Sequence, residues 1–415
     1  MNYDLCVIGA GWAGFNAAIS AARLGKKVCI IEEREIGGTC LNRGCIPTKA
    51  FVTYSKQGLS FPEIQRKKSD VVLRLKTGMS SVLKSHNIDY VEGKARIGAA
   101  DCVSVNQDKK FKSKFILIAT GAVPKDLPQL KIDHQKVISS DDVLNLEEVP
   151  KRILIVGAGA IGCEFASIFM RLGSHVTIVE IAQQLLPGFD VQVCKKLHQS
   201  FQKLGITVHI GKRAQDFNLN DYDKVLLAVG RKSVVEGLWE AGIGVTVEKD
   251  TIFVDGELRT NVSNIFAAGD CIGGYMLAHV ASYEGELAVN NMFLDAVKRD
   301  YSAVPTSVFT APEVGSIGIS ENEAKQSGIV YEVKTVHFLS VGMAHILEDT
   351  GGFIKVIVET QSGCILGASI IGLQATELVN AFSILMKNKI PITGLKKTIF
   401  AHPSVSEIIA EVANV

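Results

Sequence analysis

Two cysteines with a lysine close behind them are the residues of this chain best suited to redox chemistry. Cys40 and Cys45 are separated by four residues, and Lys49 follows four residues after the second cysteine. On a regular helix, positions five apart lie ~7.5 Å apart along the axis and ~140° around it. A bond between the two sulfurs therefore needs a distorted turn, because a disulfide tolerates only a short separation.

The residues around the pair favour such a turn. Gly37 and Gly38 give the backbone freedom to bend, and Pro47 favours a helix start over a helix interior. A thiol near a helix N-terminus has a lowered pKa, which makes it a candidate thiolate. The spacing alone leaves two alternatives open, incidental cysteines in a loop or half of a metal site. No second ligand pair is evident in the sequence, and we predict no metal.

Length and composition bound the kind of protein that carries this pair. The chain has 415 residues, enough for two to four domains, and a formal net charge of +1. That charge gives no reason to expect nucleic acid or an acidic membrane surface as the main partner. Apolar residues make up 47% of the chain, yet no run of about 18 could span a bilayer. A strand pattern begins within the first residues, leaves no room for a signal peptide and predicts a cytoplasmic protein.

Nine cysteines, an odd number scattered through predicted strands and helices, do not resemble a secreted disulfide framework. We interpret the other seven as core or incidental residues: Cys6, Cys29, Cys102, Cys163, Cys194, Cys271 and Cys364.

The element that leads into the cysteine pair is a phosphate-binding pattern. Its strand, glycine-rich turn, helix and second strand are Leu5–Ile8, Gly9–Gly14, Phe15–Leu24 and Lys27–Ile31, with Glu32 at the end. This is the dinucleotide-binding fingerprint in its required context. Gly9 permits the tight turn, Gly11 lets a pyrophosphate approach the backbone, and Gly14 lets helix pack on strand, while Glu32 can accept hydrogen bonds from a ribose.

The same pattern recurs 148 residues later, a domain-sized offset that predicts a second nucleotide site. Its parts are the strand Arg152–Val156, the loop glycines Gly157, Gly159 and Gly162 with Ile161 among them, a helix through Leu172, and the strand Ser174–Val179 ending at Glu180. A glutamate there accepts a free ribose 2′-hydroxyl and repels a 2′-phosphate, so Glu180 predicts NAD rather than NADP.

The remaining segments alternate between helical and strand patterns. Helices are expected over 56–85, and strands near Asp89–Lys94, Cys102–Val105 and Lys114–Ile118, with strand-to-glycine turns at Ala119–Gly121 and Val225–Gly230. The run Ile265–Asp270 is a strand ending in an acid, followed by a helix from near His279. From about Ala303, strands at Ser307–Thr310, Val330–His337 and Phe353–Glu359 alternate with helices at Glu321–Ser327 and Ala375–Asn388. No further phosphate loop occurs there, which predicts a separate α+β domain with a structural or assembly role.

The chain closes on a histidine followed by a proline. His402 precedes Pro403, which biases its backbone towards an extended conformation and predicts that the next helix starts after it. A lone histidine is more often structural than catalytic.

Taken together, these features resemble the pyridine nucleotide-disulfide oxidoreductase family, and within it they are most like the members that oxidise dihydrolipoyl groups. The resemblance covers essentially the whole chain. Besides the cysteine stretch and both glycine loops, it rests on Leu258–Asn261, Ala268–Asp270, Met276–His279, Phe309–Glu313 and His402–Glu407.

The resemblance implies a role for each reactive residue. Cys40 would exchange with a dithiol substrate, and Cys45 would lie against a flavin as the charge-transfer thiolate. Lys49 would sit near flavin N5 and pair with Glu164 on the second fingerprint helix. His402, oriented by Glu407, would be the general base and would enter the active site from the other subunit of a homodimer.

The resemblance also implies two cofactors, FAD and NAD. The residues expected at FAD are Gly9, Gly11, Gly14, Glu32, Thr39, Lys49, Ala95, Thr120, Gly121, Asp270, Met276, Leu277, Ala278 and His279. Those expected at NAD are Gly157, Gly159, Ile161, Gly162, Glu180 and Gly230.

The expected fold class is α/β, with two Rossmann-like nucleotide domains and a C-terminal α+β dimerisation domain. The predicted parts are an FAD-binding domain with the redox-active disulfide over 1–148, an NAD-binding domain over 149–258, a central segment completing the FAD site over 259–302, and the dimerisation domain over 303–415. The chain is shorter than the family usually is, with the missing residues near 53–85 and 214–223. Arg43 is charged where the family often has a small apolar residue, so it is either solvated or alters the potential at the thiolate.

The expected function is oxidation of dihydrolipoyl groups on carrier domains of 2-oxo-acid dehydrogenase or glycine-cleavage systems, with electrons passing through the cysteines and FAD to NAD. One alternative is an NAD(P)H-dependent reductase of another small disulfide or of Hg(II). The absence of a cysteine after Cys364 argues against the mercury enzyme, and Glu180 against a glutathione-type reductase. The alternative from a different class is a non-catalytic flavin-binding subunit.

Overall fold

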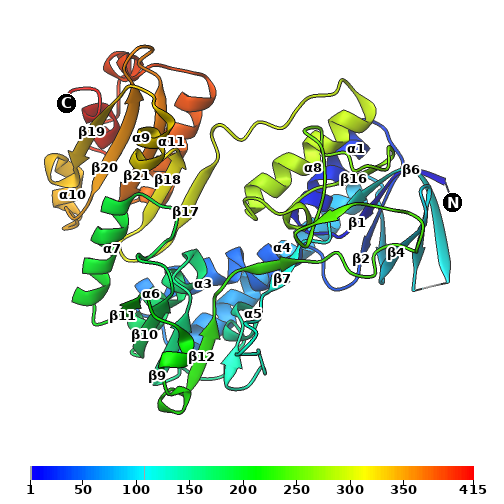
Figure 1. The fold of residues 1–415 in the computed structure, drawn as a ribbon, viewed down its shortest axis with the longest axis horizontal. Coiled ribbons are helices and arrows are strands. Elements are labelled where there is room, and N and C mark those ends of the chain that lie inside the picture. The colour runs from blue at the N-terminus through cyan, green and yellow to red at the C-terminus, as the bar shows by residue number, and fades with distance from the viewer. Residues whose placement is uncertain (1, 107) are drawn as a thin grey trace. The chain divides into compact units, whose positions relative to one another are not determined.

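The computed structural model describes residues 2–106 and 108–415. They form two compact units, each assembled from segments far apart in the sequence (Figure 1). One unit comprises the residues up to Tyr54, Pro62–Lys125 and Gly230–Arg299; the other comprises Ser55–Phe61, Asp126–Val229 and Asp300–Val415. The four-part domain division expected from the sequence stays a prediction.

A seven-stranded sheet is the centre of the first unit. Its order is β3-β2-β1-β6-β5-β4, with β16 also pairing with β6; β1 is parallel to β2 and β6, whereas β4, β5 and β6 form an antiparallel meander. The strands are β1 (Asn2–Ile8), β2 (Val28–Glu32), β3 (Asp89–Glu92), β4 (Ala95–Ala99), β5 (Cys102–Val105), β6 (Lys109–Ile118) and β16 (Ile265–Ala267). The unit also contains two separate two-stranded antiparallel sheets. One pairs β7 (Ala122–Pro124) with β13 (Arg231–Ser233), and the other pairs β14 (Val247–Glu248) with β15 (Thr251–Ile252).

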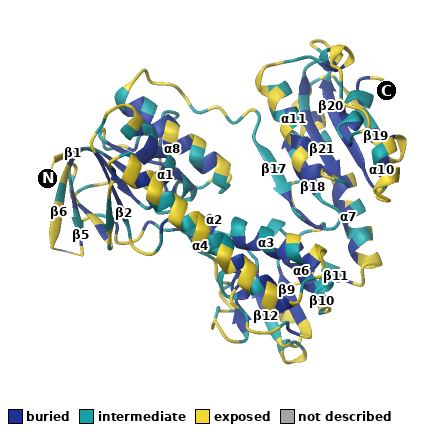
Figure 2. Ribbon diagram, turned by 180° about the vertical axis from the view of Figure 1, so that it is seen from behind, coloured by how far each residue is buried: buried dark blue, intermediate teal, exposed yellow. Residues whose placement is uncertain are grey.

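Helices α1 (Trp12–Arg23) and α8 (Ala278–Phe293) pack against each other in this unit. The strands and these helices share one apolar core, in which β1 and β2 contribute fully buried residues such as Leu5 and Ile30. By contrast, α4 (Phe61–Ser85) exposes residues along most of its length (Figure 2). Strands β1 and β2 are buried along most of their length, as parallel strands in a covered sheet usually are.

The second unit contains a five-stranded parallel sheet in the order β11-β10-β9-β12-β8. Its strands are β8 (Val137–Ile138), β9 (Arg152–Val156), β10 (His175–Glu180), β11 (Thr207–Ile210) and β12 (Lys224–Leu227), and its helices are α5 (Ser140–Val143), α6 (Ala160–Arg171) and α7 (Val191–Lys203). Alternation of strand and helix in the sequence produces this sheet, because a parallel strand needs a crossover connection.

An antiparallel five-stranded sheet in the order β17-β18-β21-β20-β19 completes the second unit. Its strands are β17 (Pro305–Val308), β18 (Val314–Gly318), β19 (Tyr331–His337), β20 (Phe353–Glu359) and β21 (Ile365–Ile371). The helices of this part are α9 (Glu321–Ser327), α10 (Gly342–Ile346), α11 (Ala375–Lys387) and α12 (Glu407–Glu411). Strand β20 and helix α11 supply much of a second apolar core.

The α/β fold class with an α+β C-terminal part is confirmed, and several elements match their predicted bounds, including β5, β9, β20 and α9. The predicted helical region 56–85 is instead the end of one helix, α3 (Cys45–Lys56), and the whole of α4. Strands β18 and β21 were not predicted, and β18 carries two glycines that weaken a strand pattern. No helix of the described residues is both long and apolar enough to cross a membrane.

Candidate functional site

The cysteine pair lies on two consecutive short helices rather than one. Helix α2 (Gly38–Arg43) carries Cys40, and Cys45 is the first residue of α3, with Gly44 as the break between them. Gly37 and Gly38 have φ angles of 90° and 55°, which glycine adopts without a Cβ penalty. The break is the distorted turn that the spacing requires, and it leaves Cys45 at a helix N-terminus.

The two cysteine side chains are in contact. The pKa of the Cys40 thiol is raised, mainly by its side-chain hydrogen bond with Cys45 and then by burial, while the Trp12 side chain and the charge of Lys49 lower it. The structure therefore brings Cys40, Cys45 and Lys49 together. A raised pKa at Cys40 is expected of a shared proton in the dithiol form, because two adjacent sulfurs do not both carry a negative charge.

The first glycine loop fits a dinucleotide. Gly9 has φ 106°, and a Cβ there would lie 2.3 Å from the Ala119 carbonyl oxygen; a Cβ on Gly14 would lie 1.9 Å from the Gly9 carbonyl oxygen. A Cβ on Gly11 would meet no atom within 4 Å. Two of the glycines are thus required by internal packing, and the third leaves open backbone at the N-terminus of α1, where a pyrophosphate binds.

The second loop repeats this geometry. Gly157 has φ 102°, a Cβ on Gly162 would lie 2.0 Å from the Gly157 carbonyl oxygen, and a Cβ on Gly159 would meet no atom within 4 Å. Ile161 lies in the first turn of α6. Gly230 follows β12 with φ 108°, and its carbonyl accepts a hydrogen bond from the Lys125 backbone.

The acids that end the two second strands hold their loops in the same way. Glu32 accepts backbone hydrogen bonds from Ala10 at 2.6 Å and from Arg34 at 2.8 Å. Glu180 accepts the equivalent bonds from Ala158 at 2.6 Å and Ala182 at 2.8 Å. A carboxylate oxygen has two acceptor positions, so both acids keep capacity for ribose hydroxyls.

Several other residues expected at FAD lie in the first unit. Thr39 accepts a hydrogen bond from Arg231 at 3.3 Å, and Thr120 donates to the Val234 carbonyl at 2.6 Å. Asp270 is held in a short turn after β16; burial raises its pKa, and the charge of Arg231 opposes that shift. Gly121 has φ 72° after β6, and Ala95 starts β4, a strand at one edge of the sheet.

Met276 to His279 form the entry to α8. Met276 has φ 48°, Leu277 caps the helix and Ala278 is its first residue, one position before the predicted start at His279. Helix α8 crosses α1 closely, because a Cβ on Gly285 would lie 2.2 Å from the Ala13 carbonyl oxygen. The Glu284 carboxylate accepts the Gly269 backbone N–H at 2.6 Å, which ties the turn before Asp270 to the same helix.

The remaining predicted residues lie in the second unit. Glu164 is buried on α6 and accepts the Phe309 backbone N–H at 2.9 Å. Lys49 belongs to the first unit, so its pairing with Glu164 stays a prediction. His402 Nδ1 lies 2.9 Å from Glu407 Oε1, and α12 starts at Glu407, after the His402–Pro403 pair. Hydrogen bonds from the Ser404 backbone and from His402 lower the pKa of Glu407.

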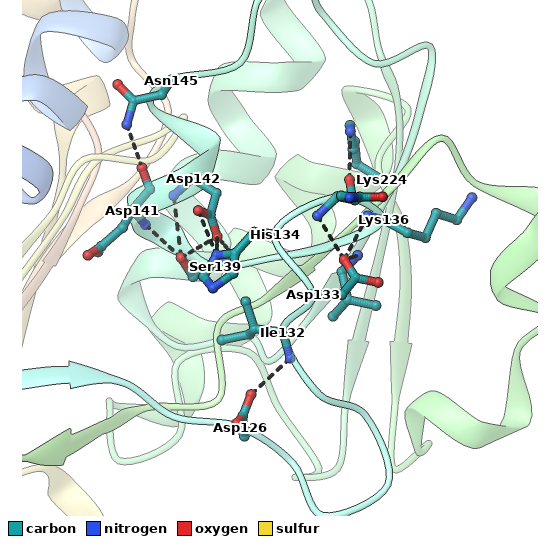
Figure 3. A network of polar contacts seen from close by, with 12 residues as sticks. Asp126, Ile132, Asp133, His134, Lys136, Ser139, Asp141, Asp142, Asn145 and Lys224 are labelled. Atoms are coloured by element: carbon teal, nitrogen blue, oxygen red, sulfur yellow. Dashed lines mark hydrogen bonds and ion pairs between the residues drawn. The ribbon is translucent and has the colours of Figure 1, made fainter.

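A second histidine lies beside a serine and an aspartate (Figure 3). The three side chains do not form a hydrolase site. His134 Nδ1 lies 3.0 Å from Asp142 Oδ1, and Ser139 Oγ donates to Asp142 Oδ2 at 2.7 Å. Both side chains bind the same carboxylate, so the histidine does not activate the serine. Ser139 and Asp142 form the capping box of α5, which explains the cluster structurally.

The sequence analysis did not predict three residues of the site, Trp12, Arg231 and Glu284. Trp12 and Arg231 could have been recognised from their positions, since Trp12 lies inside the first glycine loop and Arg231 directly follows the predicted Gly230. Glu284 could not, because an acid in the middle of a helix is usually solvated. Arg43, expected to be solvated or to act on the thiolate, forms an ion pair with Glu35 at 2.9 Å.

Comparison with known proteins agrees with this geometry. Residues 3–285 match the pyridine nucleotide-disulphide oxidoreductase family. The chain belongs to this family. Residues 304–413 match the dimerisation domain of pyridine nucleotide-disulphide oxidoreductases. Members of the family bind FAD and a pyridine nucleotide.

Dihydrolipoyl dehydrogenases are among the similar curated proteins. Those of Chlamydia muridarum and Geobacillus stearothermophilus are each 36% identical, and one of Bacillus subtilis is 33% identical; in each case the match covers 99% of this chain and 96% of the relative. Among solved structures, the HOCl-induced flavoprotein disulfide reductase RclA of Escherichia coli is 30% identical, with a TM-score of 0.92 and complete coverage of both chains. LpdA of Mycobacterium tuberculosis, 24% identical with a TM-score of 0.91, shares the fold.

Proposed function

We propose that this flavoprotein disulfide oxidoreductase oxidises dihydrolipoyl groups and reduces NAD. The contact between Cys40 and Cys45, beside the first glycine loop, carries the proposal, because it gives the protein a dithiol–disulfide pair at a dinucleotide site. Full-length similarity to dihydrolipoyl dehydrogenases supports the substrate class. Glu180 supports NAD, since its carboxylate would repel a 2′-phosphate.

The chain's own residues account for the exchange chemistry. Glu407 holds Nδ1 of His402, which leaves Nε2 to accept a proton from a substrate thiol. The resulting substrate thiolate attacks Cys40, the Cys40–Cys45 bond breaks, and Cys45 leaves as a thiolate. The second substrate thiol then attacks the substrate sulfur of the mixed disulfide and releases Cys40. The substrate thus loses two electrons and two protons, and the cysteine pair is reduced.

The cofactor residues fit the groups that the family binds. Gly11 and the α1 N-terminus would hold the FAD pyrophosphate, with Glu32 at the ribose, while Gly159 and Glu180 would do the same for NAD. FAD, when bound, would accept the two electrons from the cysteine pair and transfer them to NAD.

We further propose a homodimer in which His402 and Glu407 of one subunit serve Cys40 of the other. The match of residues 304–413 to a dimerisation domain supports the dimer. Carrier domains of 2-oxo-acid dehydrogenase or glycine-cleavage systems would present the dihydrolipoyl group, which predicts a cytoplasmic location.

A turnover assay tests the substrate. The purified protein is expected to be yellow and to reduce NAD with dihydrolipoamide, and Cys45→Ser should abolish both this turnover and the long-wavelength absorbance of the two-electron-reduced enzyme. Cys364→Ser, far along the chain from the pair, is the matched control and should retain both. Faster turnover of oxidised glutathione with NADPH than of lipoamide with NADH would refute the proposal, and absence of all turnover would favour a non-catalytic flavin-binding subunit.

Subunit mixing tests the shared site. His402→Gln and Cys40→Ser proteins are each expected to be inactive, and their hybrid dimers should recover one working site of the two. No recovered activity after verified subunit exchange would argue that each site is built within one chain.

A second candidate is a reductase of another small disulfide or of a metal ion. The structural similarity to RclA, a disulfide reductase also solved as a Cu(II) complex, favours keeping it under test. NADH oxidation driven by Cu(II), Hg(II) or a non-lipoyl disulfide at a higher kcat/KM than by lipoamide would make this the function. Among the described residues, no group of three His, Cys, Asp or Glu side chains is placed to hold a metal ion.

A further inference from the structure

Trp12 places a buried hydrogen-bond donor beside the reactive cysteines. It is the first residue of α1, and its ring packs against the apolar core of the first unit. Its indole Nε1 is buried and has no hydrogen-bond partner of ordinary geometry among the described residues. A buried N–H without an acceptor costs about 1–3 kcal/mol, so proteins rarely retain one without a function for it.

Backbone packing brings Cys40 to this donor. The Gly37 N–H donates to the Ala10 carbonyl at 2.8 Å, and a Cβ on Gly38 would lie 2.8 Å from the Gly11 Cα. The first turn of α2 therefore rests directly on the glycine loop that contains Trp12, and Cys40 lies in that turn. The Trp12 side chain is close enough to the Cys40 sulfur to lower the pKa of this thiol.

The strength of this contact depends on the charge of the sulfur. A neutral thiol is a weak acceptor, and a charge-assisted hydrogen bond is roughly twice as strong as a neutral one. The indole N–H therefore gains a good partner only when Cys40 becomes a thiolate. Lys49, whose charge also acts on Cys40, favours the same state.

We propose that Trp12 Nε1–H is the hydrogen-bond donor that stabilises Cys40 as the leaving thiolate when a dithiol substrate resolves its mixed disulfide with the enzyme. In this step the second substrate sulfur, as a thiolate, attacks the first; the substrate S–S bond forms, the bond to Cys40 breaks, and Cys40 takes the electron pair. The inference rests on the proposed function, since it assumes a dithiol substrate. Under this proposal, Cys40 has its own hydrogen-bond donor, which is separate from the groups that stabilise Cys45.

The pH dependence of Cys40 alkylation tests the donor. The holoenzyme is reduced by two electrons with dithionite, and the rate of Cys40 carboxamidomethylation by iodoacetamide is measured by mass spectrometry across pH. Trp12→Phe keeps an aromatic ring and removes the N–H, and should move the midpoint of the profile up by about one pH unit, with about tenfold slower alkylation near pH 7. Trp239→Phe changes the only other tryptophan and should leave the midpoint in place.

A fluorescence measurement needs no change at Trp12. In the Trp239→Phe protein the emission of Trp12, then the sole tryptophan, should change with pH at the same midpoint as the alkylation of Cys40, and this change should vanish in Trp239→Phe combined with Cys40→Ser. An unmoved alkylation midpoint in Trp12→Phe, or an emission of Trp12 independent of Cys40, overturns the inference.

The two proposals fail separately. Neither measurement uses a substrate, so a shifted midpoint in a protein that does not turn over dihydrolipoamide would support Trp12 as the donor and refute only the substrate. Full dihydrolipoamide turnover with an unmoved midpoint would refute the role of Trp12 alone.

Discussion

At the scale of single residues, the two glycine loops show which positions serve the fold and which serve the ligand. Gly9, Gly14, Gly157 and Gly162 each lie where a Cβ would clash with backbone, whereas Gly11 and Gly159 face open space. The same glycine motif therefore contains positions required by backbone packing and positions left open for a ligand. All of them are glycine in the sequence, so only the packing in the structure distinguishes the two kinds.

Alanine at Gly11 and Gly14 should separate these two constraints. Gly14→Ala puts a Cβ 1.9 Å from the Gly9 carbonyl oxygen and is expected to destabilise the FAD-free protein by more than the 1–3 kcal/mol typical of overpacking. Gly11→Ala meets no atom, so its stability should change by less than about 1 kcal/mol while FAD binds roughly tenfold more weakly or worse. Thermal denaturation without FAD and an FAD titration measure the two effects. Equal losses of stability in both variants would contradict this division.

The His402–Glu407 pair makes a prediction about pH. Because the pKa of Glu407 is lowered from its usual value of 4.5, its carboxylate stays ionised above about pH 5 and does not titrate near neutrality. Glu407→Gln removes the carboxylate that holds Nδ1 of His402 at 2.9 Å, so kcat/KM should fall by a similar factor at every pH above about 5. His402→Gln should lower kcat/KM by about 10²–10⁴.

The control for this pair is His86→Gln, a half-buried histidine directly after α4, which should leave kcat/KM unchanged. An unchanged kcat/KM in Glu407→Gln would show that the glutamate does not act through His402.

At the scale of elements, the crossing of α1 and α8 connects parts of the site that the sequence keeps apart. Asn16 donates to Ser282 Oγ at 3.1 Å, and Gly285 lets the two helices approach at Ala13. Helix α8 also carries Glu284, which fixes the turn at Gly269. One close helix contact thus joins the first glycine loop to residues more than 250 positions later.

Gly285→Ala should open this crossing. Its Cβ would lie 2.2 Å from the Ala13 carbonyl oxygen, so we expect a loss of at least about 1–3 kcal/mol in stability together with weaker FAD binding. Gly78→Ala, in the exposed helix α4 with no atom within 4 Å, is the matched control and should raise stability by about 0.5–1 kcal/mol. If the free energy of unfolding of Gly285→Ala in denaturant equals that of the wild type, the two helices can move apart without loss of stability.

At the scale of the whole molecule, an ion triad with two buried members helps to join the five-stranded parallel sheet and the C-terminal antiparallel sheet into one compact unit. Lys355 on β20 contacts Asp190, the N-cap of α7, at 2.8 Å and Glu321 at the start of α9 at 2.5 Å. Lys355 and Asp190 side chains are only 2% and 4% exposed. They border a cavity of about 430 Å³ between these elements.

Removing the lysine should destabilise the second unit. Lys355→Met leaves Asp190 buried without its cation and is expected to cost about 3–5 kcal/mol, whereas Lys387→Met, which breaks the exposed pair with Asp300, should cost less than about 1 kcal/mol. Denaturant unfolding of both variants is the measurement. Similar costs for the two would contradict a special role for the buried Lys355–Asp190 pair.

The same triad predicts a pH window. Burial lowers the pKa of Lys355, but its hydrogen bonds to Asp190 and Glu321 outweigh burial and raise it above the usual 10.5. Its contribution is therefore fully present below about pH 10.5 and should be lost as the pH rises further. As the pH rises above about 10.5, the free energies of unfolding of the wild type and of Lys355→Met should therefore converge.

Features that depend on local backbone requirements could be predicted from the sequence. Glycine loops between strand and helix, acids at strand ends and a proline after His402 have the same meaning wherever they occur, because φ, capping and helix starts are local properties. Strands β9 and β20 and helix α9 could likewise be predicted to the residue. The glycine-rich strand β18 could not, because its pairing with β17 and β21 defines it more than its composition does.

Contacts between groups far apart in the sequence could be identified from the folded structure alone. The contacts of Trp12 with Cys40, Glu284 with Gly269, and Lys355 with Asp190 join segments that no periodicity relates. The break at Gly44 was implied by the cysteine spacing, but its form as two helices came from packing against the first glycine loop. The physical reason is that backbone geometry is set by neighbouring residues, whereas a partner across the core is set by how whole elements pack.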